Sequence, residues 1–220
     1  MPLSIKYEVR SIIAQYPELF FPLINLVEKD KSLAVGKDTE LVIEGFPGSS
    51  NSYAEAIFTA SQFRQVKVAH HLHAPAQVVL AVRRRIPVLV LIREPSEAVV
   101  SFLSRQHRPT MISLRQALRA YIRFYEFIMP YSDQFVLGLF EDVTNNFSVI
   151  VDKLNSKFNL NFSSNIESPN YLKTRYQTKL TENQKELKKE LKGKINSPQS
   201  LPILSRANKV YKMYVSENTD

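Results

Sequence analysis

Five consecutive apolar residues, Val88 to Ile92, are the feature that most constrains the fold of this chain. Such a run is typical of a strand buried on both faces, as in a parallel sheet. Arg93 follows directly, and Pro95 suits the first position of a helix. The Arg93 guanidinium and the N–H groups of the first helical turn would then face one crevice, which favours an anion. The alternative is an ordinary strand, loop and helix with a surface arginine.

Helical spacing places three polar residues on one face of the helix that begins at Pro95. They are Glu97, Ser101 and Ser104. We therefore expect the Ser101 hydroxyl to lie where Arg93 supplies positive charge.

Strands and helices alternate through the middle of the chain, and this pattern predicts a three-layer α/β/α fold with a central parallel sheet. The expected strands are residues 40–44, 66–70, 88–92 and 135–139. The expected helices are residues 52–63, 75–84, 113–129, one capped by Asn146, 181–194 and 201–214. Ser113 with Gln116, and Thr181 with Gln184, have the spacing of capping boxes. Ligands of such sheets bind at the carboxyl ends of the strands, where Arg93 lies.

The length of 220 residues predicts one domain, and its C-terminal third, residues 161–220, is expected to be helical. The net charge of +8 favours anionic partners such as nucleic acid, membrane, nucleotide or sulfate. The absence of cysteine excludes disulfides, cysteine nucleophiles and thiolate metal sites, and fits a cytoplasmic protein.

The apolar segment Leu19 to Val27 is too short to span a bilayer and contains Pro22. We expect neither a transmembrane helix nor a signal peptide. The segment is expected to pack against the rest of the domain. Docking against a membrane or a partner is the alternative.

A second loop suited to an anion follows the first expected strand, in EGFPGSSNSYAEAIF, Glu44 to Phe58. A strand, small residues and a helix rich in N-terminal hydroxyls form the layout of a phosphate cradle. Asn51 stands where the Walker motif has its lysine, and Arg93 stands where the magnesium-binding aspartate is expected. Both departures disfavour an NTP hydrolase or kinase. The alternative is a tight turn that leads into a serine-capped helix.

Taken together, the two loops resemble the cofactor loops of sulfotransferases, a family with a fold like that of P-loop NTPases. GFPGSSNSY is similar to the family's 5′ loop, and REPSEAVVSF is similar to its 3′-phosphate motif. The resemblance implies binding of 3′-phosphoadenosine 5′-phosphosulfate (PAPS). The cofactor-binding residues that it implies are Pro47, Gly48, Ser49, Ser50, Asn51, Ser52, Arg93 and Ser101.

VAHHLHAP, Val68 to Pro75, resembles the family's short motif with a catalytic histidine, which matches His71. His70 is the alternative, because neighbouring strand residues point to opposite faces. The segment LFEDV, Leu139 to Val143, is also similar to the family, so the likeness covers about residues 38–160. It implies transfer of a sulfuryl group from PAPS to a hydroxyl or amine, with the histidine as general base and with no metal.

Gly48 departs from the family, which usually has Lys or Arg at this position. Arg64, Lys67 and Arg105 are the nearest cations in sequence that could replace it, and Lys192 to Lys194 only loosely echoes a basic segment near the 3′-phosphate. A non-catalytic nucleotide-binding relative is therefore the second hypothesis. A third is a basic protein that binds polyanions through Arg83 to Arg85 and Lys185 to Lys194.

The expected partners are the nucleotide donor and an unidentified acceptor, without a specific nucleic acid, and peripheral membrane contact stays open. The sequence leaves the oligomeric state undetermined. We expect the acceptor pocket between Arg105 and Ser113 and in the C-terminal third, with Tyr171, Arg175 and Tyr176 as candidate lining residues.

Overall fold

A central parallel sheet organises the computed structural model, which describes residues 3–28, 30–106, 112–165 and 180–216. Within these residues, the strands are β1 (Leu41–Gly45), β2 (Val68–His70), β3 (Val88–Ile92) and β4 (Val136–Leu139). Their order is β2-β1-β3-β4, and every neighbouring pair is parallel. The predicted α/β class and parallel sheet are thus confirmed.

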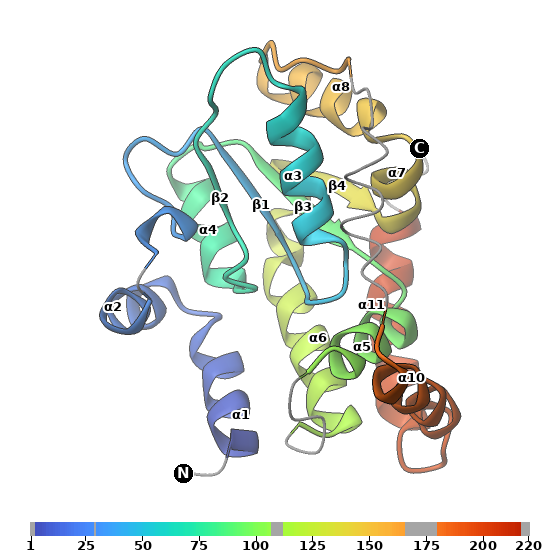
Figure 1. The fold of residues 1–220 in the computed structure, drawn as a ribbon. Helices are drawn as coiled ribbons and strands as arrows, with labels where there is room; N and C mark the ends of the chain where they lie inside the picture. Colours follow the sequence, from blue (N-terminus) through green and yellow to red (C-terminus); the bar gives the residue numbers. More distant parts are fainter. Residues whose placement is uncertain (1–2, 29, 107–111, 166–179, 217–220) are drawn as a thin grey trace.

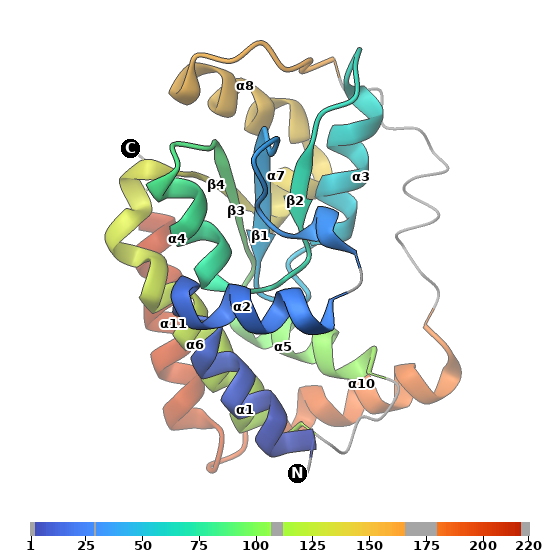
Figure 2. The ribbon, with the colours of Figure 1, turned by 90° about the vertical axis from the view of Figure 1, so that its left-hand side faces the viewer.

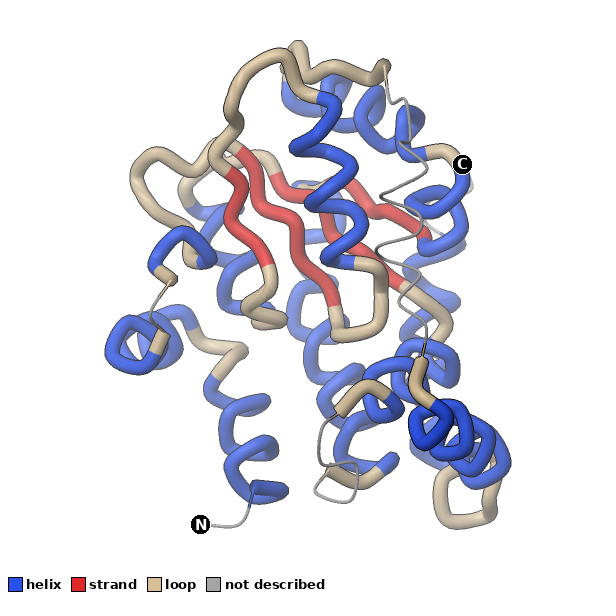
Figure 3. Tube along the Cα trace, viewed as in Figure 1, coloured by secondary structure: helices blue, strands red, loops and turns tan. Residues whose placement is uncertain are grey.

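Helices cover both faces of the sheet, as Figures 1 and 3 show. Their bounds are α1 (Leu3–Ile13), α2 (Pro17–Val27), α3 (Asn51–Ser61), α4 (Pro75–Arg83), α5 (Pro95–Ser104), α6 (Leu114–Ile128), α7 (Phe140–Asn145), α8 (Phe147–Phe158), α10 (Glu182–Ile195) and α11 (Leu201–Ser216). Short 3₁₀ helices occupy Lys31–Leu33 and Met129–Gln134. The predicted elements all form, with ends within about three residues of those expected.

The alternating side chains of β1 and β3 divide the interior into two cores. Every residue of both strands is buried, as the apolar run of β3 predicts. Val42, Val90 and Ile92 pack with α4, α5, α6 and α11, whereas Ile43 and Leu89 pack on the opposite face with α3 and α8. The sheet is therefore the middle of three layers.

The two predicted capping boxes are present. The Ser113 and Thr181 hydroxyls accept from the backbone N–H groups of Gln116 and Gln184, whose side chains return a hydrogen bond. Asn146 occupies the predicted N-cap position of α8, but its side chain makes no cap hydrogen bond to the helix backbone. The Asn146 Oδ1 instead accepts a hydrogen bond of 2.7 Å from the Ser148 hydroxyl.

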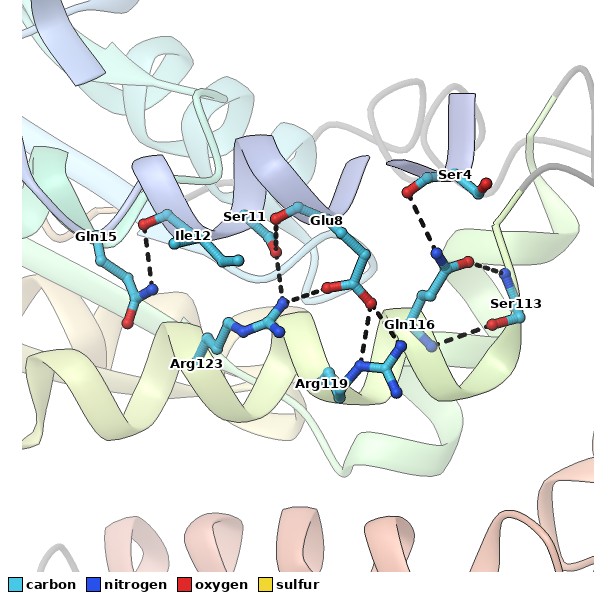
Figure 4. Close-up of polar contacts among 9 residues, drawn as sticks. All are labelled: Ser4, Glu8, Ser11, Ile12, Gln15, Ser113, Gln116, Arg119 and Arg123. Atoms are coloured by element: carbon cyan, nitrogen blue, oxygen red, sulfur yellow. Dashed lines mark hydrogen bonds and ion pairs between the residues drawn. The ribbon is translucent and has the colours of Figure 1, made fainter. Parts of the chain in front are cut away.

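Polar contacts attach the N-terminal helix α1 to α6 (Figure 4). Glu8 accepts hydrogen bonds of 2.6 Å from both Arg119 and Arg123. The Arg123 guanidinium also donates to the Ser11 hydroxyl. The side of α1 that faces the domain combines these polar contacts with Tyr7, whose ring packs against that of Phe102.

The segment Leu19 to Val27 lies in α2, and the expectation that it packs against the domain holds for only part of it. Phe20 is buried, and it belongs to a small core with Ala14, Leu72 and Ala76. Leu26, by contrast, is 83% exposed. No helix among the described residues is long and apolar enough to cross a membrane.

Candidate functional site

The loops after β1 and β3 meet at the topological switch point of the sheet, where the order of the strands reverses. From β1 the chain moves to β2 on one side and later returns to β3 on the other. In open α/β sheets, the crevice at such a switch point is the usual ligand site. A cavity of about 1130 Å³ lies here. Its lining includes Pro47, Gly48, Ser50, Asn51, Ser52, Tyr53, His71, His73, Arg93, Ser101, Phe102, Arg105, Gln106, Phe140, Thr144, Asn145 and Lys188.

The loop after β1 turns sharply into α3 because two of its residues have left-handed backbone. Gly48 has φ of 90° and Ser50 has φ of 69°. The side chain of the N-cap residue, Ser50, makes no cap hydrogen bond at the start of α3. Asn51 and Ser52, the first two residues of the helix, line the cavity. The start of α3 therefore borders the cavity, and a helix N-terminus favours an anion.

Two residues of this loop, Ser49 and Asn51, use side-chain groups in contacts within the protein. Ser49 is fully buried, and its hydroxyl lies 3.5 Å from that of Tyr125, so its predicted side-chain role at the 5′-phosphosulfate is not supported. Asn51 donates from its amide to the Phe46 carbonyl. The Asn51 Oδ1 is the buried side-chain atom without a hydrogen-bond partner among the described residues. A ligand donor could satisfy it.

Gly48 lies too close to α5 to be replaced by a larger residue without rearrangement. A Cβ atom at this position would lie 2.5 Å from the Ala98 carbonyl oxygen, and its φ of 90° is strained for any L residue. The Lys or Arg that sulfotransferases usually have here is therefore excluded by the local packing. The sequence could show the substitution but not this contact.

Arg93 bridges the two loops. Its Nη1 donates to the Gly48 carbonyl at 3.2 Å, and its guanidinium lies 3.9 Å from the centre of the Phe140 ring. Its side chain is 17% exposed, and Nη2 lies 3.5 Å from Glu97. Burial lowers the pKa of Arg93, but its ordinary value is so high that it stays charged. The structure thus fixes one cation at the cavity wall, 45 residues along the chain from the loop that it contacts.

The expected anion site at the start of α5 is occupied by the chain itself. The Glu94 carboxylate accepts from the Glu97 backbone N–H at 2.9 Å and from the Ser96 hydroxyl. Ser104, which was expected to share the polar face, is buried and donates to the Ser101 carbonyl. Ser101 lines the cavity. On this side of the cavity, the groups that remain available to an anion are the side chains of Arg93 and Ser101, whereas the start of α5 is already occupied by Glu94.

His71 lines the cavity, whereas His70 is not among its lining residues, so the first of the two predicted alternatives is favoured. The His71 Nε2 lies 2.7 Å from the Ser52 hydroxyl, and its Nδ1 makes a short contact with the His70 Nδ1. A tautomer with the proton on the His71 Nδ1 satisfies both contacts and leaves Nε2 as an acceptor. Burial, and then the nearby His70, lower the pKa of His71. His71 is therefore neutral at pH 7.

A buried carboxylate, Glu44, holds the turn that carries His71. Its oxygens accept hydrogen bonds from the backbone N–H groups of Leu72 at 2.8 Å and His73 at 3.0 Å, and from the Gln77 amide at 2.9 Å. Burial raises the pKa of Glu44 to about 8, against the opposing effect of these donors. His71 and His73 both have positive φ, so the turn needs this support. Glu44 is not recognisable as a site residue in the sequence, because it lies at the end of an apolar strand.

Two tyrosines on α6 also fix the loops. The Tyr125 hydroxyl donates to the Leu91 carbonyl at 2.7 Å and accepts from the Phe46 N–H at 3.2 Å. The Tyr121 hydroxyl donates to the Arg93 carbonyl at 2.8 Å. Helical spacing in the sequence favours apolar packing for both residues. The available signal for hydrogen bonding is that both are tyrosine rather than phenylalanine, four residues apart on α6.

Two further cations line the cavity, Arg105 at the end of α5 and Lys188 on α10. Arg105 was one of the three expected replacements for the missing loop cation. The other two lie elsewhere: Arg64 pairs with Glu40 at 2.5 Å, and Lys67 lies 4.0 Å from Asp38. Lys188 is not among the predicted site residues, because the sequence indicates only a polyanion-binding surface for the run Lys185 to Lys194.

The loosely matched basic segment at 192–194 also lies beside this site. Lys192 pairs at 2.7 Å with Glu97, which in turn faces Arg93. The candidate acceptor residues Tyr171, Arg175 and Tyr176 lie outside the described residues. Among the described residues, no group of three or more His, Cys, Asp or Glu side chains is placed to hold a metal ion.

Comparison of the chain with protein-family models, curated proteins and solved structures finds no significant match.

Proposed function

We propose that the cavity binds PAPS and that the protein transfers its sulfuryl group to a hydroxyl or amine acceptor. The observation that carries this proposal is the Arg93–Gly48 hydrogen bond, which joins the two predicted anion loops across one cavity. A fold of the P-loop sulfotransferase type is part of the same proposal. Its support is a parallel sheet with both loops at the switch point.

The lining residues suit a nucleotide that carries two phosphate groups. The uncapped start of α3 offers N–H groups for the 5′-phosphosulfate, while Arg93 and Ser101 offer charge and a hydroxyl for the 3′-phosphate. Arg105 and Lys188 add positive charge, and no carboxylate is among the lining residues. This donor set fits a polyanion.

His71 is suited to remove the acceptor proton. Its Nε2 faces the cofactor loop at Ser52, and its lowered pKa keeps the ring neutral and able to accept a proton at pH 7. Sulfuryl transfer is an in-line displacement, in which PAPS supplies the sulfuryl group. The chain's contribution is to orient the acceptor oxygen or nitrogen and to hold the charge of the leaving phosphate.

Gly48 favours a second candidate, a protein that binds the nucleotide without turnover. A stabilising contact to a leaving group is typically worth about 3 kcal/mol, or roughly 100-fold in rate. Packing against Ala98 denies this loop the usual cation. Under the first candidate, Arg105 or Lys188 supplies the missing charge.

The first test measures binding of the product nucleotide, adenosine 3′,5′-bisphosphate, through its effect on the melting temperature of the protein. At 100 times Kd, a single-site ligand stabilises a protein by about 2.7 kcal/mol, which is a rise in Tm of roughly 5–10 °C for this size of domain. Arg93→Ala should abolish the rise, whereas Arg64→Ala, which removes an arginine outside the cavity, should preserve it. Adenosine 5′-monophosphate, which lacks the 3′-phosphate, should bind more weakly. No shift at millimolar nucleotide would refute both candidates.

A transfer assay with labelled sulfate then separates the two candidates. In the variant His71→Asn, asparagine can adopt the positive φ of this position, so the turn should be kept. The variant should bind the nucleotide but lose sulfate transfer. Binding without transfer to any member of a broad pool of hydroxyl and amine acceptors would support the non-catalytic candidate.

A further inference from the structure

An apolar stripe runs along the two N-terminal helices on the solvent side. From Ile5 to Leu26 its positions advance by alternating steps of four and three residues, a spacing that places the members within each helix along one side, and Val27 follows directly. We name this surface the N-terminal stripe. Its members, all at least 41% exposed, are Ile5, Val9, Ile12, Tyr16, Leu19, Leu23, Leu26 and Val27.

Helix α1 leaves part of its apolar surface in solvent. On its inward side, Glu8 and Ser11 face α6 through ion pairs and hydrogen bonds, as Figure 4 shows, and the Tyr7 ring lies 6.0 Å from that of Phe102. Ile5, Val9 and Ile12 are left on the exposed side. A helix normally buries most of its apolar side chains. These three side chains are therefore available to a second surface.

The two helices lie together on one side of the molecule. Figure 2 shows α1 and α2 in front of the rest of the domain, and contacts with α6 and α4 hold them there. The exposed surface of these eight residues is on the order of the roughly 800 Å² that each partner gives to a standard interface, and it is larger than the largest apolar patch of a typical monomer. The area alone matches one half of a dimer interface.

Charge distinguishes between the possible occupants. Residues 3 to 28 contain two basic side chains, Lys6 and Arg10, and three acidic ones, Glu8, Glu18 and Glu28. A segment that docks on an anionic membrane usually has an excess of Lys and Arg around its apolar face. Glu18 is already paired with Arg83 at 2.5 Å. A nearly neutral rim around an apolar centre suits contact with an identical surface, because two copies then bring no net repulsion.

We propose that the N-terminal stripe is the interface of a homodimer, in which each copy covers the stripe of the other about a two-fold axis. The interface is isologous, so a single substitution acts twice. It involves α1 and α2 and does not depend on the cavity or on nucleotide.

Sedimentation equilibrium of the full chain between 1 and 100 µM tests the proposal. The wild type should show twice the mass of the chain, and the double variant Leu23→Glu, Leu26→Glu should raise the dimer Kd at least 100-fold. Phe63→Glu is the matched control: Phe63 is 92% exposed but follows α3, beyond the stripe, so this variant should dimerise normally. A wild type that is monomeric throughout, or a dimer that the double variant leaves intact, would overturn the proposal. So would a monomer that cosediments with phosphatidylglycerol vesicles, which would identify a membrane as the occupant.

A second measurement does not depend on disrupting the surface. The chain has no cysteine, so Leu26→Cys introduces a unique thiol on the stripe. A short bis-maleimide linker should join two L26C chains into a covalent dimer and leave F63C chains unjoined at the same concentration. Equal yields from the two variants, or no joined L26C product, would contradict the proposed interface.

Discussion

Gly48→Lys would introduce the cation usual in sulfotransferases, and the structure predicts that it destabilises the protein. The left-handed backbone costs a residue with a Cβ about 1–2 kcal/mol. The Cβ would also lie 2.5 Å from the Ala98 carbonyl oxygen, so the loop or α5 must move, at an overpacking cost of typically 1–3 kcal/mol. The expected loss of unfolding free energy is therefore about 2–5 kcal/mol, or a fall in Tm of roughly 10 °C.

Urea denaturation measures this loss, with Gly193→Lys as the control. Gly193 lies in α10 with no atom within 4 Å of an added Cβ, so the same substitution should stabilise the chain by about 0.5–1 kcal/mol. Because the loop must leave its position beside Arg93, Gly48→Lys should also weaken binding of adenosine 3′,5′-bisphosphate and gain no sulfate transfer. A G48K variant as stable as the wild type, or one with increased transfer, would show that the contact with Ala98 does not exclude a side chain.

Three further predictions concern caps, pH and charge. Ser113→Ala should lower the unfolding free energy by about 1 kcal/mol, whereas Asn146→Ala, which removes no cap bond, should change it by less than about 0.5 kcal/mol in the same urea experiment. Burial lowers the pKa of His73 to about 4, so the unfolded chain binds this proton from about pH 6.5 and the folded chain only near pH 4. As the pH is lowered from about 6.5 to about 4, the unfolding free energy of the wild type should therefore fall relative to that of His73→Asn, by up to about 1.4 kcal/mol per pH unit. Equal pH profiles of stability for the two proteins would contradict this. Lys188→Ala and Arg105→Ala should each weaken nucleotide binding by about tenfold in calorimetry, more at low salt than at high salt, and unchanged affinity would remove that residue from the site.

Patterns that depend on local periodicity predicted the fold well. The buried run at Val88 to Ile92 gave the central strand with its bounds, and both capping boxes formed as their spacing indicates. The sequence also predicted that Arg93 and the Gly48 loop lie at the same edge of the sheet, because the carboxyl ends of parallel strands share that edge. Asn146 shows the limit of such patterns, because a residue type suited to capping made a different bond.

The features that sequence could not predict arise from contacts between distant segments. Glu44 is recognisable as a support for the His71 turn only once β1 and β2 are paired, and Lys188 as a cavity residue only once α10 lies against α5. Local chemistry was also misjudged at Glu94, a carboxylate that occupies the helix start where an external anion was expected. In the same way, the packing of Ser49 against Tyr125 could not be read from a run of small polar residues.

The pairing of β1 with β3 has a consequence for the order in which the molecule assembles. Gly45 aligns with Leu91, although a whole strand and two helices separate them in sequence. Pairings of this kind are slow, because the intervening chain must be closed into a loop first. The Gly48 loop and Arg93 therefore meet only after the central pair has formed. A nucleotide that bridges them would recognise only the finished protein, so it should slow unfolding and leave the rate of refolding nearly unchanged.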